Sequence, residues 1–190
     1  MIIKALIGAV SVVFLWLLTS QLKRARARQI ALLVASYVFY ACWGLWFLPI
    51  LVVSSLVNYW LGRFLRSKPS AARLWLSIGV NLLLLGFFKY MPPLARVAPA
   101  SSFMHRFGNL SLPLGLSFWT FQAMSYLFDL YREKEMDPSL LEFCLYMAFF
   151  PTVISGPICR MGELLPQFRR RITLHWLDFA SGVKRISLGL

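Results

Sequence analysis

The sequence predicts an all-α fold: a polytopic bundle of membrane helices with one re-entrant segment. Apolar residues make up 59% of the 190 positions and acidic residues account for only 7 of them, while the mean hydropathy is +0.67. This composition is typical of membrane proteins and exceeds what a soluble core of this size needs. The apolar residues also come in runs of about 20, the length that crosses roughly 30 Å of hydrocarbon.

The basic residues lie in short clusters between the apolar runs. The net charge is +13, which in a soluble protein would favour a nucleic-acid partner. Clusters placed between apolar runs are instead typical of loops held on the cytoplasmic face by the positive-inside rule. We therefore expect a lipid bilayer as the partner, and no nucleic acid.

A first span is expected over residues 5–22, and the basic cluster KRARAR follows it at 23–28. A secretory signal peptide would carry its positive charge ahead of the apolar core, whereas here Lys4 is outweighed by the basic residues behind the run. We therefore expect a retained helix with its N-terminus outside and KRARAR in the cytoplasm.

The 33 residues from Ile30 to Gly62 carry no charge. As one helix they would reach about 50 Å, well beyond a single crossing. The run must therefore fold back, and Gly44 offers the break because aromatic residues typical of the membrane interface surround it. This predicts spans at about 29–43 and 46–63, with a basic return loop on the same side as KRARAR.

A fourth span is predicted at about 72–91. It ends in FFKYMPP, where Lys89 can reach the interface and the two prolines stop the helix. Residues 92–111 are expected to form an external loop, and a fifth span follows at 113–131.

The segment at 140–168 breaks this pattern because its apolar run is too short to span and is followed by proline and glycine. A full crossing would put Arg169, Arg170 and Arg171 outside, against the charge bias. Irregular backbone at membrane depth is tolerated only where protein buries it or where it lines a water-filled cavity. We therefore expect this segment to be re-entrant.

The rest of the chain indicates no second domain. Residues 174–190 predict an interfacial helix, and no repeat or linker is present, so we expect one membrane domain over 1–190 that is incomplete. Cys42, Cys144 and Cys159 lack the spacing of a zinc site or a disulfide framework, so we expect no bound metal and take them as small buried residues.

Polar residues recur on the fifth span at spacings of three and four. Gln122, Ser125, Asp129 and Arg132 therefore share one face, and polar groups in a bilayer usually face the bundle interior or a cavity. One reading is hydrogen bonding between helices with an Asp129/Arg132 pair at the interface, and the other is the wall of a substrate path. Smaller polar stripes on the third and fourth spans are expected to be packing faces: Ser54, Asn58, Gly62, Ser77 and Asn81.

The re-entrant segment contains a rigid turn at Gly156-Pro157. Arg160 and Glu163, three positions apart, could pair on the short helix that follows. One reading is a kinked helix end with a capping arginine. The other is an arginine fixed beside an opened backbone, where it could hold an anionic or carbonyl-bearing group.

The chain contains five ordered blocks: YVFYACWG (37–44), SSLVNYWLG (54–62), LLGFFKY (84–90), LPLGLSFWTFQAMSYLFDLYR (112–132) and FFPTVISGPICRMGELLPQF (149–168). Together they resemble the membrane-bound O-acyltransferases, in particular the bacterial branch with the alginate O-acetylation and teichoic acid D-alanyl transfer proteins. Met161 departs from the pattern of that family, since an aromatic residue often follows the arginine that corresponds to Arg160.

The resemblance implies a bundle around a funnel in the bacterial inner membrane. It implies transfer of an acyl group, most simply acetyl, from a cytoplasmic thioester donor toward hydroxyls of an extracytoplasmic polysaccharide or a periplasmic relay protein. The donor would be acetyl-CoA or an acyl carrier, with no bound cofactor. The family's invariant histidine lies downstream of the matched blocks, so no catalytic residue is expected in this chain. The positions that match the motif are implied to shape the donor tunnel: Pro151, Gly156, Pro157, Arg160, Glu163 and Pro166.

Two other functions stay open. One is a transporter or export subunit, although nothing in the chain mirrors the Gly-Pro break, as the paired inverted repeats of many transporters would. The other is a truncated product with no activity of its own.

Overall fold

The structure is a computed structural model, and it describes residues 24–99, 103–132, 136–154, 156–170, 181–182 and 184–185. All regular elements in these residues are helices, which confirms the predicted all-α class. The predicted span at 5–22 and most of the predicted helix at 174–190 lie outside the described residues. The helices are α2 (Ala25–Ala41), α3 (Phe47–Ser67), α4 (Ala71–Val97), η1 (Phe103–Phe107), α5 (Leu116–Arg132), α6 (Leu140–Ala148) and α7 (Met161–Arg169).

Two of these helices, α3 and α4, are long and apolar enough to cross a membrane. They have 21 and 27 residues, whereas α2 and α5 have 17 each. At 1.5 Å per residue, 17 residues reach about 25 Å, slightly less than the hydrocarbon thickness. With nine residues, α6 is far too short to cross.

The chain folds back at Gly44, as the uncharged run predicts. Helix α2 ends at Ala41 and α3 begins at Phe47, whose amide donates to the Gly44 carbonyl oxygen at 3.0 Å. A side chain on Gly44 would meet the Phe47 ring at 2.8 Å, so glycine lets the ring close over the turn. Trp43 and Trp46 are exposed there, as expected of aromatic rings at a membrane interface.

The three cysteines differ in burial. Cys144 is buried, Cys159 is intermediate and Cys42 is exposed. The expectation of a buried thiol is wrong for Cys42 because this residue follows α2 in the fold-back turn rather than facing a neighbouring helix.

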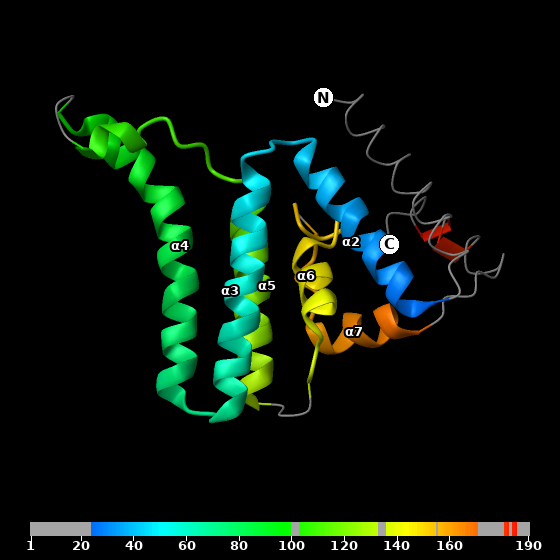
Figure 1. Ribbon diagram of the computed structural model, residues 1–190. Helices are drawn as coiled ribbons and strands as arrows, with labels where there is room; N and C mark the ends of the chain where they lie inside the picture. Colours follow the sequence, from blue (N-terminus) through cyan, green and yellow to red (C-terminus); the bar gives the residue numbers. More distant parts are fainter. Residues whose placement is uncertain are drawn as a thin grey trace.

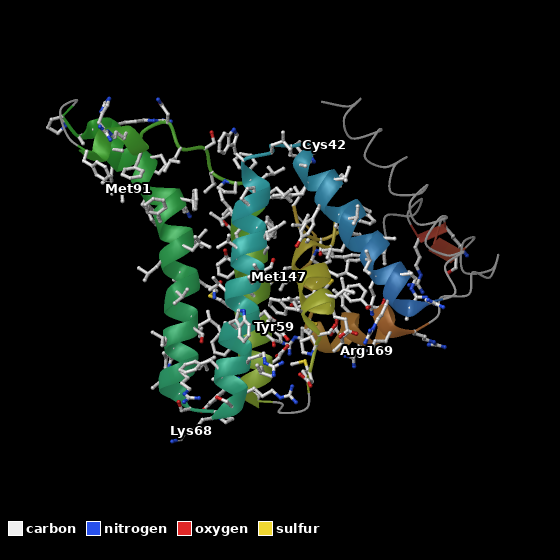
Figure 2. The ribbon with its side chains drawn as sticks, viewed as in Figure 1. Cys42, Tyr59, Lys68, Met91, Met147 and Arg169 are labelled. Atoms are coloured by element: carbon white, nitrogen blue, oxygen red, sulfur yellow. The ribbon has the colours of Figure 1, made fainter. Side chains whose placement is uncertain are left out.

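Helix α4 continues past the predicted end at 91. Pro92 and Pro93 lie inside it, and it ends at Val97. Each proline removes only its own N–H from the helical ladder, and a bend can relieve the clash of its ring with the preceding turn. The axis of α4 changes direction close to Met91 (Figure 2), so the two prolines bend this helix rather than stop it.

Helix α3 packs against both α4 and α5. Asn58 and Asn81 exchange side-chain amide hydrogen bonds of 3.0 and 2.7 Å between α3 and α4. A Cβ on Gly62 would lie 2.5 Å from the Tyr126 hydroxyl, so the glycine admits the tyrosine of α5 against α3. The polar stripes predicted to be packing faces do pack between helices.

Apart from the turn between α6 and α7, the connections of the bundle lie toward two opposite ends (Figure 1). Cys42 and Met91 lie at one end, while Lys68 lies at the other, with Arg169 toward it (Figure 2). The start of α2 lies beside the end of α7, because Arg28 donates hydrogen bonds to the carbonyl oxygens of Phe168 and Arg170.

The segment from Leu140 to Arg169, which contains α6 and α7, reverses its direction inside the bundle, and we call it the reversing segment. Helix α6 runs along α2 and α3, and α7 then crosses beneath α6 and the start of α2 (Figure 1). The two ends of the segment meet, because Arg169 contacts Glu142 at 2.7 Å. The start and the end of this segment therefore lie next to each other.

Candidate functional site

The turn between α6 and α7 is built from short-range backbone hydrogen bonds. The Val153 amide donates to the Phe149 carbonyl oxygen at 2.9 Å, and the Gly156 amide donates to that of Thr152 at 3.2 Å. A Cβ on Gly156 would lie 2.5 Å from the Thr152 Cα and 2.8 Å from the Pro151 carbonyl oxygen. No side chain fits at Gly156, which explains the glycine of the Gly-Pro pair.

The turn packs directly against the start of α5. Gly115 has a φ of +76°, in the left-handed region that favours glycine. A Cβ at this position would lie 2.1 Å from the Val153 carbonyl oxygen. The motif LPLG therefore ends in a glycine for two reasons, its backbone conformation and the approach of the turn.

Tyr146 connects α6 to both neighbouring segments. Its hydroxyl lies 2.9 Å from the Cys159 carbonyl oxygen and 3.2 Å from that of Gln122. In return, the Gln122 side-chain amide donates to the Tyr146 carbonyl oxygen at 2.7 Å. Since Gln122 and Tyr146 are buried, these bonds satisfy polar groups in an apolar interior and fix the returning strand of chain beside α5.

Arg160, just before α7, pairs with Asp129 of α5 at 3.3 Å. The sequence suggested Arg160–Glu163 and Asp129–Arg132 pairs, and the structure joins one partner from each. The guanidinium side chain is 63% exposed and the carboxylate side chain is 14% exposed. The contact therefore holds a partly buried acid against an arginine whose remaining donors bond to no other group among the residues that the structure describes.

Glu142 and Arg169 join the start of the reversing segment to its end. Ser139 and Glu142 form a capping box at the start of α6, and Arg169 donates to both carboxylate oxygens of Glu142, at 2.7 and 2.9 Å. The hydrogen bonds from Arg169, followed by those from Ser139, lower the pKa of Glu142 from 4.5 to about 2, although burial acts in the opposite direction. Glu142 is therefore a carboxylate at neutral pH.

Arg28 of α2 fastens the end of α7. Its guanidinium donates to the Phe168 carbonyl oxygen at 3.1 Å and to that of Arg170 at 2.6 Å. These carbonyls stand at the C-terminus of a helix, where a cation is favoured. One arginine of the KRARAR cluster is thus buried in the fold and does not merely mark the charged side of the membrane.

The predicted site residues fall into three groups. Gln122, Ser125 and Asp129 line the face of α5 beside the reversing segment, with Gln122 buried and the other two intermediate. Pro151, Gly156 and Pro157 form its turn, and Arg160 joins the turn to Asp129. Glu163 and Pro166 are exposed on α7.

Other residues of the site were not predicted. Gly115, Tyr146, Glu142 and Arg169 hold the segment in place, yet of these only Glu142 had a local sequence signal, the capping-box pattern with Ser139. Trp119 Nε1 and Thr120 Oγ1 are buried on α5 without a hydrogen-bond partner in the described part of the chain.

The described residues hold no group of three or more metal-ligating side chains. One cavity of about 470 Å³ lies between α3 and α4 and is mostly apolar. Another, of about 620 Å³, lies where α2, α6 and α7 meet. Neither is lined by the turn residues Pro151, Gly156 or Pro157.

The chain is a relative of bacterial O-acetyltransferases of the membrane-bound O-acyltransferase type, and the resemblance stated from its sequence is confirmed. Together with the apolar helices α3 and α4, this indicates a membrane protein. No family model matches the sequence, and no solved structure matches it.

The relatives are named as follows. The chain is 38% identical over 178 residues to the probable alginate O-acetylase AlgI of Pseudomonas putida, covering 86% of this chain and 36% of that protein. It is 37% identical to that of Pseudomonas aeruginosa, covering 86% and 34%. It is 32% identical over 200 residues to the peptidoglycan O-acetyltransferase of Helicobacter pylori, covering 84% and 36%. The chain thus spans about a third of the length of these relatives.

Proposed function

We propose that this chain forms part of an O-acetyltransferase that modifies a polysaccharide outside the cytoplasm. The acyl group, most simply acetyl, would come from a cytoplasmic thioester donor, acetyl-CoA or an acyl carrier, and would pass toward hydroxyls of the polysaccharide or to a periplasmic relay protein. The carrying observation is the similarity, over most of this chain, to relatives named as O-acetylases and O-acetyltransferases. These names favour the transferase over a transporter or export subunit.

In this proposal the protein is a multi-pass protein of the bacterial inner membrane, with its N-terminus outside and its basic end in the cytoplasm. The segment 140–168 is re-entrant. Support comes from its nine-residue helix α6, from the reversal after it, and from the Glu142–Arg169 contact that returns the chain to its starting end. Protein packs against the irregular backbone of the turn on several sides, which is the condition for such backbone at membrane depth.

We assign the donor path to the polar face of α5 and the turn that lies against it. Arg160 is positioned by Asp129 and keeps donors available for a carbonyl or phosphate oxygen of the donor. The other proposed wall residues are Gln122, Ser125, Pro151, Gly156, Pro157, Glu163 and Pro166. No residue of this chain is assigned as the base that deprotonates the acceptor hydroxyl.

The test replaces Arg160 by alanine in the whole protein, in the cells that make the polysaccharide, and measures polysaccharide acetyl content at matched membrane levels of protein. The Arg160 guanidinium is 63% exposed, and a pair that is open to solvent on one side contributes only about 1 kcal/mol to stability, so the fold should survive. We expect acetyl content to fall by about tenfold or more, since misplacing a donor substrate is costly. Asp129→Asn, which weakens the contact that positions Arg160, should also lower the acetyl content.

Arg106→Ala, which removes an exposed arginine from η1, is the matched control and should leave acetyl content unchanged. Unaltered acetyl content in the Arg160→Ala protein would refute the assigned donor path. Absence of acetyl groups from the polysaccharide of wild-type cells would refute the acetyl transfer itself.

A further inference from the structure

The cavity of about 620 Å³ at the junction of α2, α6 and α7 lies outside the proposed donor path. It combines charged and apolar walls. Arg26 and Gln29 come from the first two turns of α2, Glu142 and Arg169 from the two ends of the reversing segment, and Leu140 and Leu141 from the start of α6. A pocket with both kinds of wall fits an amphipathic ligand better than a wholly polar one.

The charged wall favours an anion. The negative charge of Glu142 is already balanced, because this carboxylate accepts hydrogen bonds from Arg169 and lies 3.4 Å from the Gln29 amide nitrogen. Arg26 is exposed and forms no ion pair with any acidic residue that the structure describes. The lining side chains thus leave one net positive charge, that of Arg26, facing the cavity.

An apolar stripe leads away from Arg26 along α2. Ile30, Val34 and Val38 follow Arg26 at successive steps of four, so they lie on the same face of the helix. Their exposed fractions are 51%, 55% and 57%. At 1.5 Å per residue, Val38 lies about 18 Å along the helix axis from Arg26. This distance is close to the thickness of one leaflet, that is, half of the hydrocarbon core together with its headgroup boundary.

We propose that this junction binds an anionic phospholipid, with its phosphate at Arg26 in the cavity and one acyl chain along Ile30, Val34 and Val38. The charge of the cavity and the length and exposure of the apolar stripe match the two halves of such a lipid. A basic pocket at the membrane surface is a known way of holding anionic headgroups. The lipid site is independent of the acetyl-transfer assignment.

The experiment titrates the purified whole protein in detergent with phosphatidylglycerol and phosphatidylcholine of identical acyl chains and counts bound lipids by native mass spectrometry. We expect phosphatidylglycerol to bind about fivefold more tightly, the value of one basic residue near a membrane surface. Arg26→Gln should abolish that preference. Lys68→Gln, which removes an exposed charge from the same end of the bundle, should retain it.

A second arm adds glycerophosphoglycerol, the headgroup without acyl chains, and inorganic phosphate. If either displaces the lipid at a concentration equal to that of the lipid, the site takes soluble phosphates and the lipid assignment is overturned. Equal binding of both lipids, or an equal loss of preference in the Lys68→Gln protein, would overturn it as well. Retained preference in wild type and Lys68→Gln, together with its loss in Arg26→Gln, would support it.

Discussion

Gly115 and Gly156 are the residues at which the backbone of the reversing segment comes closest to its surroundings. Gly156 was identifiable from the sequence, because a Gly-Pro pair indicates a turn by itself. Gly115 was not, since the Val153 carbonyl that excludes a side chain there belongs to a distant part of the chain. Local turn chemistry can be read from neighbouring residues, but a close approach between distant segments cannot.

We expect Gly115→Ala to destabilise the protein by about 2 kcal/mol or more, because alanine is disfavoured at positive φ and its Cβ would overlap the Val153 carbonyl oxygen. The measurement is the unfolding midpoint of the purified protein in mild detergent. Gly79→Ala in α4 is the control, since a Cβ there meets nothing within 4 Å. Equal midpoints for the two variants would contradict the role given to Gly115.

Glu142 makes stability depend on pH in acid. Its pKa is lowered from 4.5 to about 2 in the folded protein, so the stabilisation is present above about pH 4.5 and is lost as the pH falls toward 2. The size is at most about 3 kcal/mol, because the half-exposed Arg169 is screened by solvent.

The check compares thermal midpoints of the wild type and Glu142→Gln between pH 7 and 3. The wild type should be more stable at pH 7, and the difference should shrink below pH 4.5. Other carboxylates titrate in the same range and act on both proteins, so only the difference is diagnostic. A difference that stays constant across the range would mean that Glu142 does not carry the effect.

Among the elements, the pair α3 and α4 is joined by a polar contact inside an apolar interface. Asn58 and Asn81 bond to one another and also to backbone carbonyls of their own helices. A hydrogen bond between membrane helices contributes about 0.6 to 2 kcal/mol to stability. Lipid offers these polar groups no alternative partner, but the contribution stays small because the groups also find partners within the unfolded chain.

We expect Asn58→Leu and Asn81→Leu each to destabilise the protein by about 1 kcal/mol, and the double variant to lose less than the sum. Each single change leaves one buried amide without its partner, whereas the double change removes both. Unfolding in a denaturing detergent measures the four proteins. Strictly additive losses would show that the two residues act separately.

The helices themselves were largely predictable from charge and apolar run length. The fold-back at Gly44 follows from an uncharged run too long for one crossing, and the breaks before α4 and α6 follow from basic or mixed-charge loops. The end of α4 was not predicted, because a proline signals a helix stop only where a bend cannot accommodate it. The partner of Arg160 was not predicted either, since α5 and α7 are far apart in sequence and meet only through tertiary packing.

For the whole molecule, the reversal of the α6–α7 segment predicts which positions share a side of the membrane. In a background without native cysteines, Lys68→Cys and Arg170→Cys should both resist a membrane-impermeant thiol reagent in intact cells. Arg106→Cys in η1, at the other end of the bundle, should react.

Breaking the cells open provides the control, because all three positions should then react. Labelling of position 170 but not of position 68 in intact cells would mean that the segment crosses the membrane completely. Labelling of both, without labelling of 106, would reverse the proposed orientation but would keep the re-entrant path.

The order of synthesis gives the contact between Glu142 and Arg169 a further consequence. The two residues are separated by 27 positions. At a synthesis rate of about 5 to 20 residues per second, Arg169 is therefore added roughly one to five seconds after Glu142. During that interval α6 lacks the contact between Glu142 and Arg169 at its first turn, whereas the long helices α3 and α4 have already left the ribosome. Insertion of the reversing segment therefore follows that of the helices before it, and those helices supply the surface against which it packs.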